Sequence, residues 1–121
     1  MKYDFSDCTL DPDCHELRRG GRAVAVEPRV FDLLLYLLEH RHRLINKSEL
    51  IRVVWRGRYI SDWALSTCLK GVRRAIGDSG KRQALIRTVP GRGYRFVGEV
   101  AVHASMAGGA FFGSIAGYSK G

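Results

Sequence analysis

The segment from residue 61 to residue 76 restricts the fold of this chain more than any other part of the sequence. Its apolar side chains recur at helical spacing, at Leu65, Cys68, Leu69, Val72 and Ile76. This spacing is typical of an amphipathic helix that buries one face. Ser61 supplies a side-chain oxygen that can cap the first turn, so we predict a helix over 62–76. So short a helix is marginal in isolation, and other elements must cover its apolar side.

Two more helices are predicted before it. Pro28 suits the first turn of a helix, and the dense apolar run behind it predicts a mostly buried helix through about His40. Asn46 and Glu49 have the spacing of a capping box, in which Asn46 caps the helix and the Glu49 side chain reaches back. Gly57 then ends this second helix.

The second and third predicted helices are separated by a short basic connector at 56–60, which is typical of a helix-turn-helix. On a helical wheel the residues opposite the apolar stripe are Trp63, Thr67, Lys70 and Arg74, with Ser66 and Arg73 on the flank. Such side chains can bond base edges or phosphates in the major groove of DNA. Two alternatives stay open, because Arg73 and Arg74 can also be solvated cations near a helix end. Trp63 can also pack on the connector or on the hairpin that follows.

Short strand-like runs flank the helices. The runs at 2–5, 8–10, 15–18 and 22–26 predict a small antiparallel sheet, and those at 85–88 and 94–97 predict a hairpin around 89–93. Arg87, Arg92 and Arg95 lie on or beside this hairpin, and Arg92 stands between two glycines at its tip. An arginine in that place suits a phosphate or a narrow minor groove, although a simple solvated turn is the alternative.

The fold class is therefore α+β, with a small N-terminal sheet, three helices and a C-terminal hairpin. We predict one domain over residues 1–100. Residues 101–121 are rich in Gly, Ala and Ser and are predicted to form a flexible tail or linker.

Positive charge is concentrated in the second half of the domain. Residues 41–100 carry 14 Lys and Arg against 4 Asp and Glu, a net charge of +10, whereas residues 1–40 carry 5 against 8, a net charge of −3. This asymmetry indicates a surface that binds a polyanion, the alternative being a solvated basic face.

Other chemistry finds little support in the sequence. His40 and His42 are two residues apart and cannot share a helical face, so we predict no metal site and no cofactor. Neither a nucleophile–base pair nor a phosphate-binding loop is recognisable, so we do not expect an enzyme. The sequence contains no run of 18 apolar residues and no secretory signal, which predicts a cytoplasmic location without a membrane segment.

Several motifs together carry a family resemblance. They are EPRVFDLL at 27–34, NKSEL at 46–50, VW at 54–55, SDWAL at 61–65, VRRAIGD at 72–78 and IRTVPGRGYRF at 86–96. Over about residues 3–98 the chain resembles the winged helix-turn-helix DNA-binding domain of the bacterial OmpR/PhoB family. The resemblance implies a transcriptional regulator that binds double-stranded DNA, with the helix at 62–76 in the major groove and the hairpin, or wing, at 85–97 on the minor groove or backbone. A winged-helix module for protein–protein interaction is the alternative.

Carried over by position, the resemblance implies DNA contacts from Trp63, Ser66, Thr67, Lys70, Arg73, Arg74, Arg87, Thr88 and Arg92. It also implies that Arg56, Gly57, Arg58 and Tyr59 form a loop that meets RNA polymerase, and that two copies bind DNA as a tandem homodimer.

The sequence departs from the family at three points. Pro90 stands where many members carry Arg, so we expect the contact of the wing to depend on Arg92. Gly71 stands where many members carry a polar or basic residue, so we expect one helix contact to be missing. The domain starts at residue 3, so no phosphorelay receiver domain precedes it in this sequence, and the layout resembles CadC/ToxR-type regulators.

Overall fold

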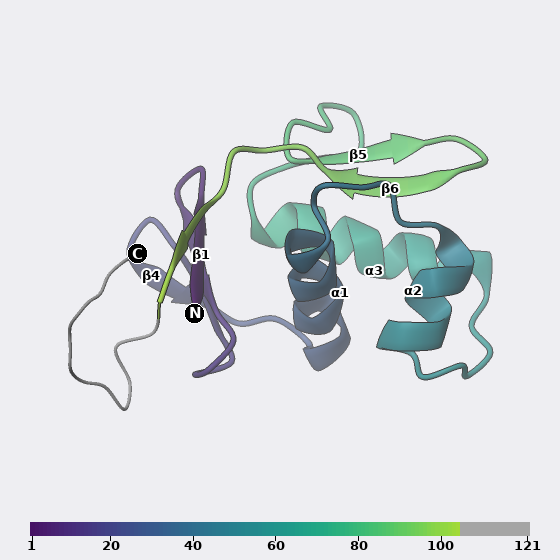
Figure 1. Cartoon of the computed structure of the whole chain (residues 1–121), viewed down its shortest axis with the longest axis horizontal. Coiled ribbons are helices and arrows are strands. Elements are labelled where there is room, and N and C mark those ends of the chain that lie inside the picture. Colours follow the sequence, from purple (N-terminus) through teal and green to yellow (C-terminus); the bar gives the residue numbers. More distant parts are fainter. Residues whose placement is uncertain (105–121) are drawn as a thin grey trace.

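The computed structural model describes residues 1–104, which form two sheets and three helices (Figure 1). The strands and helices are β1 (Lys2–Phe5), β2 (Cys8–Asp11), β3 (Glu16–Arg19), β4 (Arg22–Val24), α1 (Pro28–Glu39), α2 (Lys47–Val54), α3 (Asp62–Ala75), β5 (Ile86–Val89), β6 (Gly93–Phe96) and β7 (Ala101–His103). One antiparallel sheet has the order β4-β3-β2-β1-β7, and β5 and β6 form a separate hairpin. The five-stranded sheet stands beside the helices, and the hairpin lies over α3 (Figure 1). The predicted α+β class and the winged-helix order of elements are confirmed.

The core forms where the apolar faces of the three helices meet the inner face of the five-stranded sheet. α1 contributes the largest apolar share, and its buried residues are Val30, Phe31, Leu33, Leu34, Leu37 and Leu38. Phe5 of the sheet and Phe96 of the hairpin meet edge to face, with ring centroids 5.1 Å apart. The hairpin and the N-terminal sheet are therefore parts of one core.

The chain returns to the first sheet after the hairpin, which differs from the predicted boundary at residue 100. Residues 101–103 form β7 and pair with β1, with Lys2 opposite His103. His103 Nε2 also lies 2.9 Å from the Asp4 carboxylate on the neighbouring strand. Three residues carry too little periodicity to predict a strand, and the available edge of β1 decides their conformation. The remainder of the predicted tail, 105–121, lies outside the described residues.

The cap of α2 is only half of the predicted capping box. The Asn46 side chain accepts the Glu49 backbone N–H at 2.8 Å, as expected. The Glu49 carboxylate does not reach back to Asn46. It accepts hydrogen bonds from Arg43, at 2.8 Å from Nη1, and from the Tyr36 hydroxyl. These bonds, the one from Arg43 first, lower the pKa of Glu49 from its ordinary value of 4.5 to about 2. Glu49 thus joins α2 to α1.

Gly71 has a packing role in this fold. A Cβ built on Gly71 would lie 3.2 Å from Val30 Cγ2, so α3 crosses α1 closely at this point. The lack of a side chain at residue 71 therefore has a physical reason, because this position faces α1.

The base of the hairpin is attached to the segment that leads into α2. Ile45 and Tyr94 exchange two backbone hydrogen bonds of 2.8 Å each. Gly93, just before Tyr94, has a φ of +145°, and a Cβ there would lie 2.1 Å from the Ile45 carbonyl oxygen. Only glycine permits this close approach.

Gly93→Ala is expected to destabilise the domain by about 3 kcal/mol or more, because it adds a clash with backbone to an unfavourable φ. Gly91→Ala is the matched control. Gly91 also has a positive φ, of +74°, but a Cβ there meets no heavy atom of residues 1–104 within 4 Å. The control is expected to cost about 1–2 kcal/mol. Urea unfolding of the two variants measures the difference, and equal losses would contradict this account of the hairpin base.

Candidate nucleic-acid interface

α3 has the two faces that its sequence predicts. Leu65, Leu69 and Val72 are buried against the rest of the domain. The exposed residues of the opposite face are Trp63, Ser66, Thr67, Lys70 and Arg74. Ser61 caps the helix, since its hydroxyl accepts the Ala64 N–H at 3.1 Å. The helix thus presents a row of polar and cationic side chains to solvent.

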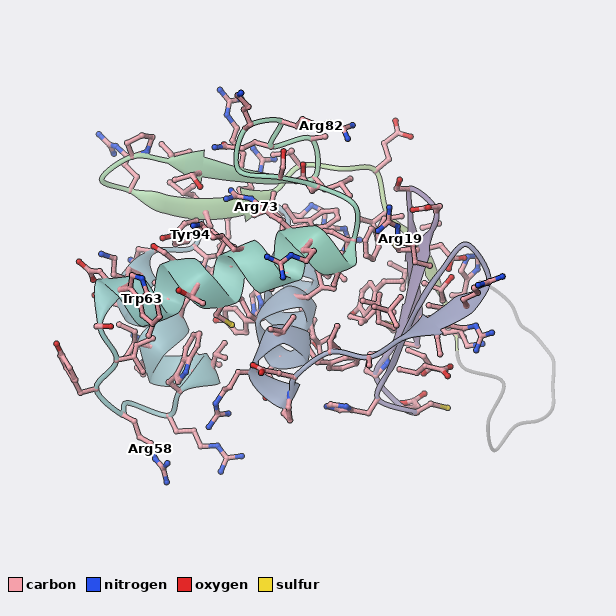
Figure 2. All side chains as sticks on the ribbon, turned by 180° about the vertical axis from the view of Figure 1, so that it is seen from behind. Arg19, Arg58, Trp63, Arg73, Arg82 and Tyr94 are labelled. Carbon is pink, nitrogen blue, oxygen red and sulfur yellow. The ribbon has the colours of Figure 1, made fainter. Side chains whose placement is uncertain are left out.

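Trp63 is the most exposed large apolar residue of this face. Its side chain is 75% exposed and lies near the beginning of α3 (Figure 2). It lines a groove of about 710 Å³ between α3 and the segment that joins β4 to α1. Thr67, Lys70 and Arg74 line the same groove. Four of the predicted helix residues are therefore brought together along one depression.

The turn between α2 and α3 is shaped by two left-handed residues. Arg56 has a φ of +55° and Gly57 a φ of +79°. The Gly57 N–H donates to the Ile51 carbonyl at 3.0 Å and closes the end of α2. Tyr59, in the connector that follows, is 91% exposed. The predicted loop 56–59 thus stands out from the domain beside the beginning of α3.

The hairpin places three arginines on the outside, and the third, Arg95 on β6, donates from Nε to the Arg41 carbonyl at 3.3 Å. Arg87 on β5 and Arg92 in the turn are both exposed, and the Arg92 N–H donates to the Val89 carbonyl at 2.9 Å. A hollow of about 500 Å³ separates this turn from the beginning of α2, where Lys47 and Ser48 line it. Neither Lys47 nor Ser48 was among the predicted site residues. Their signal in the sequence is their place directly after the Asn46 cap, at the first turn of the first helix of the helix-turn-helix.

Arg73 and Thr88 were predicted to contact DNA, and the structure instead joins them to each other. Arg73 is only 6% exposed and points from α3 toward the hairpin (Figure 2). Its Nη2 donates to Thr88 Oγ1 at 2.8 Å and to the Ile86 carbonyl at 3.0 Å. The burial of Arg73 could not be predicted from the helical pattern. Arg73 lies on the flank of α3, and a helical wheel cannot show that a hairpin distant in sequence covers that flank.

The exposed cations of α3 and of the wing are not neutralised by acidic side chains of the described residues. Within residues 1–104 no ion pair engages Lys70, Arg74, Arg87 or Arg92, whereas Lys47 is paired with Asp62 at 2.9 Å. Unpaired cations on one face attract a polyanion.

Two other kinds of site are absent from the part of the chain that the structure describes. No group of three or more His, Cys, Asp or Glu side chains in residues 1–104 could hold a metal ion. None of the helices α1 to α3 has the length and the apolar character needed to cross a lipid bilayer.

Comparison with known proteins decides the family. Residues 21–96 match the model of the family described as transcriptional regulatory protein, C terminal. This chain belongs to that family, the OmpR/PhoB-type DNA-binding domains. The family's function is sequence-specific DNA binding in transcription regulation. The predicted resemblance is confirmed.

Two named regulators illustrate the relationship of this OmpR/PhoB-type domain to longer proteins. It is 28% identical to the transcriptional activator CadC of Escherichia coli K12 over 89 residues. This match covers 73% of this chain and 17% of CadC. It is 31% identical to the transcriptional regulator HilA of Salmonella typhi over 101 residues. This match covers 84% of this chain and 18% of HilA. The chain thus spans less than a fifth of the length of either regulator.

Solved structures agree on the fold. The DNA-binding domain of Klebsiella pneumoniae RstA, in complex with the RstA box, is 26% identical, with a TM-score of 0.69 over 78% of this chain and 95% of that one. The DNA-binding domain of E. coli CadC is 24% identical and superposes with a TM-score of 0.72 over 84% of this chain and 96% of that one.

Proposed function

We propose that this OmpR/PhoB-type domain binds double-stranded DNA with α3 in the major groove and the β5–β6 wing on the neighbouring minor groove or backbone. The observation that carries the proposal is the exposed row of Thr67, Lys70 and Arg74 on a helix whose other face is buried. A major groove about 12 Å wide admits such a helix. The RstA domain, which was solved in complex with the RstA box, supports DNA as the partner.

The residues of this face differ in the contacts that they can make. Thr67, Lys70 and Ser66 offer donors, and Thr67 also offers a methyl group, all of which suit base edges. Arg74 can reach a base or a phosphate. Arg87 and Arg92 on the wing suit phosphates or a narrow minor groove, where negative potential is concentrated. Trp63 can pack against sugar and backbone at the beginning of the helix.

Lys70→Ala and Arg74→Ala are each expected to weaken binding to a selected duplex by about 1–3 kcal/mol if the side chains read bases. Lys2→Ala removes the same charge from an exposed position of β1 and serves as the control. Gel-shift titrations on specific and scrambled duplexes measure the effect. Unchanged affinity in both α3 variants would contradict the assignment of this face.

Arg92→Ala is expected to weaken binding to specific and scrambled duplexes alike and to lower the slope of log K against log salt by about 0.9, the value for one released phosphate contact. Titrations at several salt concentrations measure the slope. An unaltered slope would count against a contact between the wing tip and DNA.

We also propose that the exposed loop 56–59 contacts RNA polymerase when the domain is bound to DNA. Support comes from its projection beside α3 and from the exposed Tyr59 ring, since interface energy is often concentrated in tyrosines.

Tyr59→Ala is expected to weaken recruitment of purified bacterial RNA polymerase to the domain–DNA complex by more than about 1 kcal/mol and to leave DNA affinity unchanged. Fluorescence anisotropy of labelled duplex, with and without polymerase, separates the two steps. Equal recruitment by the variant and the parent would exclude the loop as a contact.

A protein-interaction module is the second candidate, because Tyr59 and Trp63 are both highly exposed. Tighter binding to a selected duplex than to its scrambled version at moderate salt separates the candidates, because a chain of net charge +8 is retained on any duplex at low salt. Tandem binding by two copies stays a prediction, which footprints on a selected site can test by their repeat spacing.

A further inference from the structure

We propose that Arg73 is a positioning residue for DNA binding: its buried guanidinium fixes the wing relative to α3, so that both reach the duplex together. The inference rests on the proposed function, because it assigns Arg73 an indirect part in the same interface. It takes the place of the direct DNA contact that the family resemblance implies for Arg73 and Thr88.

The contacts of Arg73 join the recognition helix to one strand of the wing. Nη2 bonds both the Ile86 carbonyl and the Thr88 hydroxyl, which are two residues apart on β5. A planar guanidinium that holds two acceptors on one strand restricts rotation of the strand as well as its distance from the helix. Arg73 thus fixes the orientation of β5 relative to α3.

Asp78 supplies a second fixed point at the start of the same strand. Its carboxylate accepts the backbone N–H groups of Ala84, Leu85 and Ile86 at 2.8 to 2.9 Å. The Asp78 N–H donates in turn to the Arg73 carbonyl at 2.8 Å. Helix end, loop and strand are therefore tied in one hydrogen-bonded unit that contains both Arg73 and Asp78.

The two strands of the wing are held by different elements. β5 is bonded to α3 through Arg73, while β6 is bonded through Tyr94 to Ile45, just before α2. Beyond these bonds the turn at Gly91 has open space around it within residues 1–104. The place of Arg92 at the tip is consequently decided at the base of the wing.

Burial of Arg73 carries a desolvation penalty. Its Nε is buried and has no hydrogen-bond partner within residues 1–104, and burial lowers the pKa of the guanidinium, while Asp78 opposes that shift. Replacing buried charges with apolar residues of similar volume is often neutral or stabilising. An arginine here gives the orientation of the strand, which an apolar residue cannot.

A double-mutant cycle tests the inference. In the parent, Arg92→Ala is expected to weaken binding to a selected duplex about tenfold, and in the Arg73→Met background by less than about threefold, because a displaced wing has already lost its contact. Lys70→Ala is expected to keep its full effect in both backgrounds, since Lys70 lies on α3 itself. An undiminished Arg92→Ala effect in the Arg73→Met background would overturn the proposal.

Thr88 provides variants that leave the buried charge in place. Thr88→Val removes the hydroxyl and is expected to reduce the Arg92→Ala effect as Arg73→Met does, whereas Thr88→Ser keeps the hydroxyl and is expected to preserve it. Identical cycles for the valine and serine variants would contradict the proposed role. These variants keep the test decisive if Arg73→Met fails to fold.

Hydrogen exchange of the free domain gives a readout that needs no DNA. Arg73→Met is expected to speed exchange of the Ile86 and Thr88 amides of β5 at least about tenfold, and to leave amides of β1 and β2 unchanged. If the parent binds no duplex, the proposed function fails, while faster exchange in β5 still supports Arg73 as the residue that holds this strand. Unchanged exchange at Ile86 and Thr88 would overturn that role whatever the binding result.

Discussion

The packing of the apolar face of α3 against α1 decides most of what this domain can do. Leu65, Leu69 and Val72 are buried on this face, and Gly71 allows the two helices to approach closely. Because α3 cannot rotate without exposing these side chains, Lys70 and Arg74 are fixed on the outside. The position of the cationic row is therefore a consequence of the core.

The wing supplies contacts that α3 alone cannot supply. A single short helix in a groove gives few contacts, and the hairpin adds a second group of cations at a separate place on the surface. Such an arrangement is useful only if the angle between helix and hairpin is constant. Three sets of hydrogen bonds supply this constancy, from Arg73, from Asp78 and from the exchange between Ile45 and Tyr94.

Much of this fold could be predicted from the sequence because its signals are local. The period of the apolar stripe gives α3, Pro28 gives the start of α1, and the glycines around Arg92 give the turn of the wing. What could not be predicted depends on tertiary partners that the local pattern does not identify. β7 exists because β1 offers an edge, and Glu49 bonds to Tyr36 and Arg43 instead of completing a capping box.

The candidate site shows the same division. Exposure of Trp63, Thr67, Lys70 and Arg74 follows from the helical period alone. The burial of Arg73 follows from a hairpin that begins more than ten residues later, and periodicity contains no information about it. Lys47 and Ser48 were missed for a similar reason, since only the fold brings them beside the wing.

Dimethyl sulfate protection on a duplex selected by this domain tests the central claim most directly, because it reports guanine N7 in the major groove and adenine N3 in the minor groove. Protection of guanine N7 at the centre of the site, with adenine N3 protected on one flank, is the predicted result. Loss of the flank signal alone in Arg92→Ala would identify the wing. A selected duplex that the domain binds without any protection of guanine N7, although guanines occur within its site, would contradict recognition by α3 in the major groove.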